Sequence, residues 1–378
     1  ADSLTAPAAV GPVGRARGRA GYRPFEGRAV FARPPTHPPP ASRPAPLPHT
    51  STMNPIAPRH SLITGALVAT SFFALTSMQS STPRTLILPA EQKEILSHMS
   101  IVFLDDGQGG VAKTVRVEGV NLQLVNGTND TETMNGVGNL LVGYNDLQFT
   151  EVDDRTGSHN VVVGRQNNYA SYGGIAVGRR HEIMNRYCAV ISGRGGVATG
   201  AESAVIGGDS NDATGPRSAV FGGNNNFATG DNATVVGARQ SRAEGRWSLV
   251  AGGAQNRAIG ESTTTLGGTQ NASVADRSTI SGGRDNRTRG EWASVSGGYE
   301  NEATGQYASV SGGRDNVASG NESSILGGVD NVTDGRFSTV CGGDNNRATA
   351  TSAGVAGGRN RSATTNGHTV IGPMTYAP

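Results

Sequence analysis

The dominant feature of the sequence is a set of apolar positions that recurs every 15 residues between Ile175 and Ile371. Residues 293–305 read ASVSGGYENEATG, and residues 308–320, one period later, read ASVSGGRDNVASG. A β-branched residue, a Gly-Gly pair, an Asn-x-Ala segment and a further Gly return in nearly every unit. Self-similarity at a fixed period is the signature of a repeat architecture. We therefore predict a repeat domain over residues 139–372.

The length of the unit indicates the kind of repeat. Fifteen residues are too few for a helix-turn-helix unit, which needs about 33, but they suit two short strands and two tight turns. β-Branched residues favour strands, and paired glycines favour a tight turn with positive φ. The expected fold is all-β: a parallel β-solenoid or β-roll of about 13 or more 15-residue turns. At a strand spacing of about 4.8 Å, its length would be roughly 60 Å.

One column of the repeat is almost always Asn. In stacked turns these side chains would lie above one another and hydrogen bond amide to amide along the axis, which stabilises stacked β-structure. Alternatively, they are turn residues in the left-handed conformation that Asn tolerates. The predicted ladder comprises Asn256, Asn271, Asn286, Asn301, Asn316, Asn331 and Asn346.

The predicted core is thin, because each turn offers about one Val or Ile and one Ala. At about 25 cal/mol per Å² of apolar area, such a turn gains only a few kcal/mol against the entropy of ordering 15 residues. Association of several chains along a common axis would bury a second face. The thin core therefore predicts a homo-oligomer.

The repeats resemble a known family. The segments SAVIGG at 203–208 and ASVSGG at 293–298, each followed by an Asn-x-Ala-x-Gly segment, are similar to the head repeats of trimeric autotransporter adhesins, the YadA-like family. The resemblance covers roughly residues 139–372. It implies a left-handed parallel β-roll that trimerises, and a surface adhesin that binds extracellular matrix protein or glycan. The family's repeat is commonly 14 residues with a Val-Ala-Ile-Gly strand, whereas this chain has 15 with Val-Ser-Gly-Gly.

The N-terminal region divides in two. Residues 1–52 are rich in Pro, Arg and Ala and lack Met; they are either untranslated upstream sequence or a disordered arm for acidic partners. Residues 53–81 have the layout of a signal peptide, with Arg59 and His60 before the apolar run 61–75. That run is too short for a comfortable span of about 20 residues. We expect an exported chain that starts between about Ser77 and Thr85 and has no membrane span, which N-terminal sequencing would check.

Removing the leader changes the charge balance. The whole chain has 32 basic and 30 acidic residues, a net charge of +2. Residues 1–80 contain eight Arg and two acidic residues, so the remainder is about −4. The basic character belongs to the leader, and a nucleic-acid partner is therefore not expected.

Residues 82–138 are expected to form a small N-terminal cap, and residues 373–378 a tail. A short helix is predicted at 89–97. The apolar segments 100–104 and 114–117 flank Asp105–Gly110 and predict a β-hairpin. A cap is expected because open β-edges aggregate.

No motif for catalysis is found. The sequence lacks a His-Glu-x-x-His metal motif, a Gly-x-Ser-x-Gly elbow and a phosphate loop, so we expect no enzymatic activity and no cofactor. Cys188 and Cys341 would lie about ten turns, roughly 50 Å, apart, far beyond the Cα limit of about 7 Å for a disulfide. In a symmetric trimer, a cysteine near the axis would meet its own copies.

Three columns are candidates for binding. The first is aromatic and is expected to bind sugars, peptides or an apolar partner, or else to pack over the glycine turns or between chains. The second alternates Arg and Tyr, as in a cation–π stack. The third is acidic, and its repulsion would be relieved by neighbouring arginines or by a bound Ca²⁺. The columns are, in order, Tyr187, Trp247, Trp292, Tyr307 and Phe337; Arg284, Tyr299 and Arg314; and Asp285, Glu300, Asp315 and Asp330.

These observations favour a non-enzymatic secreted or cell-surface repeat protein, which we expect to be a trimeric, adhesin-head-like binding rod. The alternatives are a purely structural fibre or spacer, of the kind found in phage fibres or envelope shafts, and a cation-binding repeat module. An ice-binding solenoid would need a regular Thr ladder, which the isolated Thr263–Thr265 does not provide.

Overall fold

The computed structural model of the protein describes residues 88–148 and 153–372. The expected upstream segment 1–52, the signal peptide 53–81, the first residues of the cap and the tail 373–378 lie outside the described residues. Within the described residues, no helix combines the length and apolar character needed to cross a membrane.

The predicted hairpin is confirmed. Helix α1 (Ala90–Ser97) precedes strand β1 (Met99–Asp105), which pairs antiparallel with β2 (Val111–Val117). The connecting turn is held by Asp106, whose Oδ1 accepts backbone N–H groups of Gln108 (2.9 Å) and Gly110 (2.8 Å). These two hydrogen bonds hold the pKa of Asp106 below its usual value.

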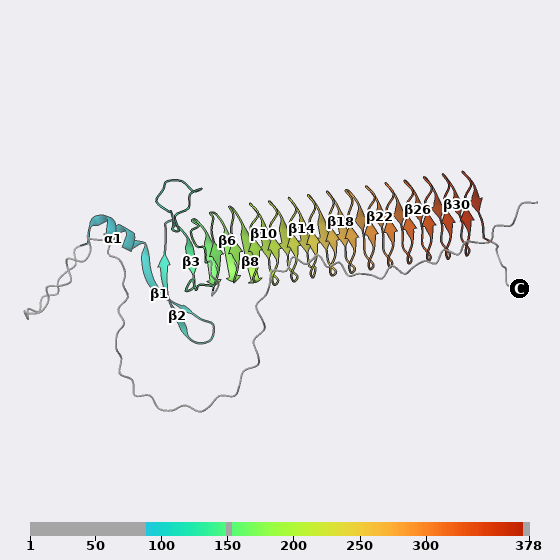
Figure 1. Ribbon diagram of the computed structural model, residues 1–378. Helices are drawn as coiled ribbons and strands as arrows, with labels where there is room; N and C mark the ends of the chain where they lie inside the picture. The colour runs from blue at the N-terminus through green and yellow to red at the C-terminus, as the bar shows by residue number, and fades with distance from the viewer. Residues whose placement is uncertain (1–87, 149–152, 373–378) are drawn as a thin grey trace, which may run out of the picture. The chain divides into compact units, whose positions relative to one another are not determined.

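The predicted parallel β-solenoid is also confirmed. It is a stack of turns, each with one strand in a larger sheet of 16 strands and one in a smaller sheet of 14 strands, so it contains about 14 turns (Figure 1). The larger sheet comprises β3 (Leu140–Val142), β4 (Val161–Arg165), β6 (Ile175–Arg179), β8 (Ala189–Arg194), β10 (Ala204–Ile206), β12 (Ala219–Phe221), β14 (Thr234–Val236), β16 (Leu249–Ala251), β18 (Thr264–Leu266), β20 (Thr279–Ile280), β22 (Ser294–Val295), β24 (Ser309–Val310), β26 (Ser324–Ile325), β28 (Thr339–Val340), β30 (Gly354–Val355) and β32 (Thr369–Val370). The smaller sheet comprises β5 (Asn168–Tyr169), β7 (Glu182–Ile183), β9 (Val197–Ala198), β11 (Asp212–Ala213), β13 (Phe227–Ala228), β15 (Arg242–Ala243), β17 (Arg257–Ala258), β19 (Ala272–Ser273), β21 (Arg287–Thr288), β23 (Glu302–Ala303), β25 (Val317–Ala318), β27 (Val332–Thr333), β29 (Arg347–Ala348) and β31 (Ser362–Ala363).

The register follows the sequence period. Val205 pairs with Val220 and Val295 with Val310, each 15 residues away. The first turns are irregular: Leu140 pairs with Val161, and Val161 with Ile175. Identical columns of the sequence therefore become straight rows along the solenoid.

The core is narrow. The Val or Ile of the larger sheet and the Ala of the smaller sheet point inward, and nearly all are at most 1% exposed. Thr265 takes the Val position in one turn, and Ser273, Thr288 and Thr333 take the Ala position in others. Next to these rows lies the buried Asn column, so the interior of most turns holds a small apolar pair and one amide.

Candidate functional site

Two outward columns of the larger sheet carry no charge, although three strands near its start end in an exposed arginine. Its strands alternate, so that the residues on either side of each buried Val or Ile point outward. From Leu140 and Val142 in β3 to Thr369 and Ile371 at the last turn, neither outward column contains Asp, Glu, Lys, Arg or His. We call these two columns the charge-free face. Its exposed large apolar residues are Leu140, Val142, Ile175, Ile206, Phe221, Val236, Leu266, Leu326 and Ile371.

The outer face of the smaller sheet, by contrast, carries many charged residues. Its outward positions are rich in Arg and acidic residues that form ion pairs between adjacent turns. Arg257 pairs with Glu244 (3.0 Å), Arg289 with Glu302 and Arg347 with Asp334. Exposed ion pairs of this kind contribute little stability. Their number indicates that this face is in contact with water.

The aromatic column lies at the corner that leads from a smaller-sheet strand to the next larger-sheet strand. We call this corner the aromatic edge. Its five rings are between 43% and 53% exposed, so they do not fill the chain's own core. All five residues have φ between 54° and 60°, a left-handed conformation that is unfavourable for bulky side chains. Tyr187 does pack over a glycine turn, as one alternative anticipated: a Cβ at Gly173 would lie 2.7 Å from its ring.

Rings and guanidinium groups stack along the aromatic edge. Trp292 and Tyr307, on adjacent turns, have ring centroids 6.2 Å apart and planes within 7° of parallel. Arg277, one turn before Trp292, places its guanidinium 5.1 Å from that ring and pairs with Glu291 (2.6 Å). Arg246 and Arg336 lie over Trp247 and Phe337 in the same way, at 3.7 and 4.4 Å. The edge is therefore an ordered row of partly exposed rings and largely compensated charges.

Replacing two rings of this row should leave the fold intact. In Trp292→Ser/Tyr307→Ser, the loss should stay within about 1.5 kcal/mol of unfolding free energy, because stacking of half-exposed rings contributes no more than that. Thermal melting by circular dichroism measures this, with Ser262→Ala, in the same column, as the control. A collapse of the melting temperature would show that the rings hold the fold or an interface between chains.

The Arg–Tyr column lies at the opposite corner, after the Gly-Gly pair. Arg284, Tyr299 and Arg314 are adjacent in register. The guanidinium of Arg284 lies 5.5 Å from the Tyr299 ring, as a cation–π contact requires. Arg314 instead faces Asp315, at 3.4 Å. Only half of the expected stack therefore forms.

The acidic column occupies the next position, on four consecutive turns. Asp285, Glu300, Asp315 and Asp330 all have φ between 53° and 57°. Partial burial, a hydrogen bond with Glu300 and the nearby negative charges raise the pKa of Asp315. Arg284 and Arg314 each pair with the following Asp, at 3.1 and 3.4 Å. Among the described residues, no group of three or more His, Cys, Asp or Glu could hold a metal ion.

The Asn column runs through the core, with all seven residues at most 1% exposed. Its hydrogen bonds run mainly to the backbone rather than amide to amide. Oδ1 of Asn286 accepts the backbone N–H of Asn301 (2.9 Å), and this pattern repeats from turn to turn. Nδ2 of Asn301 donates to the carbonyls of Gly297 (3.0 Å) and Gly313 (2.9 Å). The left-handed turn conformation belongs to the preceding acidic column, not to these Asn residues.

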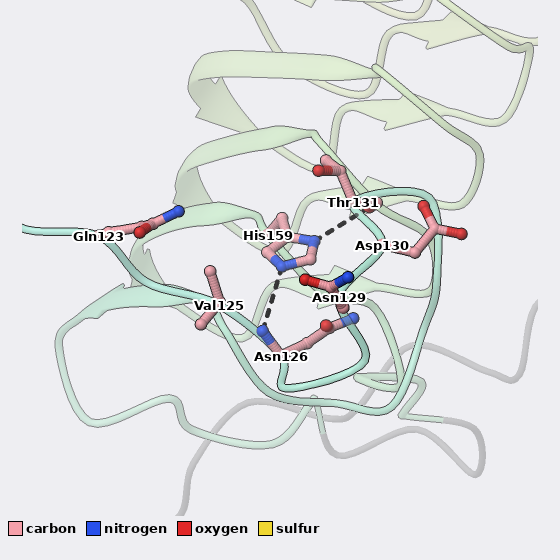
Figure 2. A pocket seen from close by; sticks show the side chains of 7 residues that line it. All are labelled: Gln123, Val125, Asn126, Asn129, Asp130, Thr131 and His159. Atoms are coloured by element: carbon pink, nitrogen blue, oxygen red, sulfur yellow. Dashed lines mark hydrogen bonds between the residues drawn. The ribbon is translucent and has the colours of Figure 1, made fainter.

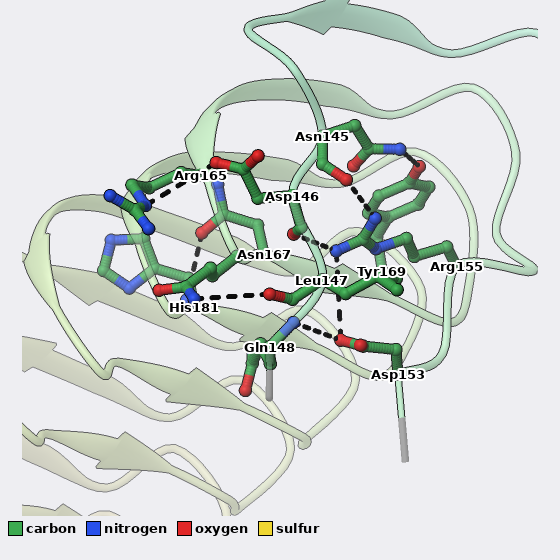
Figure 3. Close-up of polar contacts among 11 residues, drawn as sticks. Asn145, Asp146, Leu147, Gln148, Asp153, Arg155, Arg165, Asn167, Tyr169 and His181 are labelled. Carbon is green, nitrogen blue, oxygen red and sulfur yellow. Dashed lines mark hydrogen bonds and ion pairs between the residues drawn. The ribbon is translucent and has the colours of Figure 1, made fainter. Parts of the chain in front are cut away.

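The Asn column begins in a polar cluster that sequence reasoning missed (Figure 3). His181, fully buried, takes the Asn position: its N–H donates to Oδ1 of Asn167 (3.0 Å), and its Nδ1 accepts the N–H of Gly196 (3.1 Å). Gly178 has no side chain, which leaves room for the imidazole, because a Cβ there would clash with Nε2 of His181. Burial lowers the pKa of His181. Nearby, Arg155 donates to the carbonyls of Asn145 and Asp146 and fastens the loop onto the first turns.

A small pocket of about 180 Å³ lies where residues 123–131 meet His159 (Figure 2). Nε2 of His159 accepts the N–H of Asn126 (3.2 Å), and its Nδ1 lies 3.0 Å from the carbonyl of Thr131. Both ring nitrogens are therefore occupied in positioning the chain. His159 thus ties residues 126 and 131 to the first turns of the solenoid.

Asp212 is a partly buried acid on the outer face of the smaller sheet, between Val197 and Phe227 in register. Burial, reinforced by Glu182, raises its pKa to about 6 from 3.8. The carboxyl group of Asp212 thus holds its proton more tightly in the folded state than in the unfolded state. Proton binding therefore favours the folded state at low pH, and this gain in unfolding free energy is lost as the pH rises from 3.8 to about 6.

Asp212→Asn should therefore raise the melting temperature above pH 6 and change it little at pH 4. Melting curves at the two pH values measure this, and Glu261→Gln controls for the loss of one acid elsewhere. An equal gain at both pH values would contradict the raised pKa.

In the comparison with known proteins, no family model and no curated protein matches the chain.

Proposed function

We propose that the protein is a non-enzymatic repeat protein that assembles with copies of itself, as a trimer, through the charge-free face. The single observation that supports this is the absence of charge along the full length of that face. If copies pack around an axis parallel to the solenoid, each column meets its own copies, because cyclic symmetry brings identical residues together. Any charged column would then meet like charges, which is unfavourable. The outer face of the smaller sheet points away from the axis in this assembly, so its charged columns do not meet copies of themselves.

In this assembly the aromatic edge and the charged face of the smaller sheet stay available to partners. We propose that the assembly is an exported, adhesin-like rod that binds extracellular matrix protein or glycan along the aromatic edge. Supporting observations are the partly exposed rings, which suit recognition of a partner, and the resemblance of the repeats to adhesin heads.

A purely structural spacer is the second candidate. It is favoured by the stack of Arg277, Trp292 and Tyr307, in which the rings already satisfy one another. Binding of wild-type protein to immobilised matrix proteins and glycans, lost in Trp292→Ser/Tyr307→Ser at unchanged mass, would favour the binding rod. Equal signals for both proteins would favour the spacer.

Cross-linking tests the assembly at the proposed surface. Both cysteines are free; Cys341 is exposed and follows β28 on the charge-free face, whereas Cys188 is buried. A short bismaleimide should join two chains through Cys341, and the product should disappear in Cys341→Ser but persist in Cys188→Ser. Labelling of Cys341 that yields only single chains would contradict packing through this face.

A further inference from the structure

The solenoid changes its interior at one turn. The apolar core falls into two clusters, one ending at Ala258 and the other beginning at Ile280. Between them the inward positions are hydroxyls. Thr265 donates to Ser273 Oγ (2.9 Å), whose own hydroxyl donates to the carbonyl of Thr264 (3.0 Å). We call the segment that follows strand β18, residues 269–278 with the buried Ser273 and Ser278, the hydroxyl junction.

The corner after the larger-sheet strand changes at the same place. Before the junction the first glycine of the pair has positive φ, for example 72° in Gly252 and 66° in Gly267, whereas Gly282 and Gly297 do not. Before it, Gly252 N–H donates back to Val236 (2.8 Å); after it, Ser296 N–H donates forward to Val310 (2.9 Å). Strands of the larger sheet shorten from three residues to two.

The charge-free face changes there too. Before the junction its second outward column carries Ile206, Phe221, Val236 and Leu266, each between 38% and 42% exposed. After it, the next three positions of the column are Ser281, Ser296 and Ser311. Apolar area, the source of favourable burial, is therefore concentrated before the junction.

We propose that the section before the junction, residues 140–266, provides the affinity between copies, and that the hydroxyl section after it, residues 279–371, lies against the same axis and adds little. This inference rests on the assembly proposed above and states which part of the charge-free face provides the binding free energy between copies. The partner is a second copy rather than an unrelated protein, because both sections are free of charge although the section after the junction is mostly hydroxyl, with Leu326 and Ile371 as its exposed large apolar residues. An unrelated partner gives no reason to exclude charge from the hydroxyl section, whereas symmetric self-packing excludes it along the whole face.

Sedimentation equilibrium of the full chain tests this with three double variants. Phe221→Ser/Val236→Ser gives the apolar section the residues of the hydroxyl section and should weaken association at least about tenfold. Val317→Ser/Val332→Ser removes apolar groups from the opposite outer face and should leave association unchanged. Ser296→Val/Ser311→Val should tighten it, because those serines already lie at the axis. Circular dichroism confirms folding of each variant; the replaced apolar side chains lie on outer faces, so the single chain does not need them.

The outcomes distinguish failure of this inference from failure of the proposed assembly. Two results would overturn the placement of affinity before the junction. One is association of Phe221→Ser/Val236→Ser as strong as that of the wild type. The other is weakening of equal size in Val317→Ser/Val332→Ser. No tightening in Ser296→Val/Ser311→Val overturns the contact of the hydroxyl section with the axis. A wild-type chain that is itself single at all concentrations overturns the proposed assembly, and this inference with it.

Discussion

Val295→Asp and Val310→Asp should each unfold the turns around them. Both side chains are 1% exposed, in a core too narrow to admit water or a counter-ion. Burying an unpaired carboxylate there should cost at least about 4 kcal/mol, even if the group takes up a proton. Because each turn contacts only its neighbours, the loss should be local first and should spread along the solenoid.

Thermal and denaturant unfolding by circular dichroism measures this loss. Thr304→Asp is the matched control, since its column on the smaller sheet already carries Glu244 and Asp334. We expect the control to melt like the wild type. Near-normal melting of both Val variants would mean that the Val column does not point inward.

Asn301→Ala should have the second largest effect. The substitution leaves two backbone groups without a hydrogen bond, the N–H of Asn316 (3.1 Å) and the carbonyl of Gly297 (3.0 Å). The carbonyl of Gly313 loses one of its two hydrogen bonds and keeps that from Tyr299 N–H (2.9 Å). Each unsatisfied buried group costs about 1–3 kcal/mol, so the total should be several kcal/mol. With so little apolar area in each turn, this column is a major source of stability.

The control is Asn224→Ala, at an exposed corner position without positive φ, whose side-chain amide donates a long hydrogen bond to the carbonyl of Asp209 (3.5 Å). Denaturant titration should place it within about 0.5 kcal/mol of the wild type. An equally small effect in Asn301→Ala would show that the backbone groups find other partners and that the Asn column is not essential.

The period and the identity of the inward columns could be predicted from the sequence, because a residue such as Val295 or Asn301 recurs with its whole neighbourhood. The partners of the Asn amides could not, since backbone carbonyls leave no trace in a sequence. His181 was missed because it interrupts its column, although its alignment with Asn167 and Gly196 is visible once the shorter first turns are aligned.

The charge-free face could have been found from the sequence. The signal in the sequence is the absence of charged residues on both sides of each Val or Ile in the inward column. An absence is easily overlooked when the aromatic and acidic columns are the features that stand out. The left-handed backbone of Trp292 and Tyr307 could not have been found, because local preference argues against bulky residues there. Stacking between adjacent turns, which depends on register, compensates for that preference.

Sedimentation equilibrium of the wild-type full chain tests the central claim, symmetric assembly through the charge-free face, most directly. We predict a single species with three times the mass of one chain, and the same mass for Trp292→Ser/Tyr307→Ser. The mass of one chain, unchanged from low to high concentration, would contradict the account.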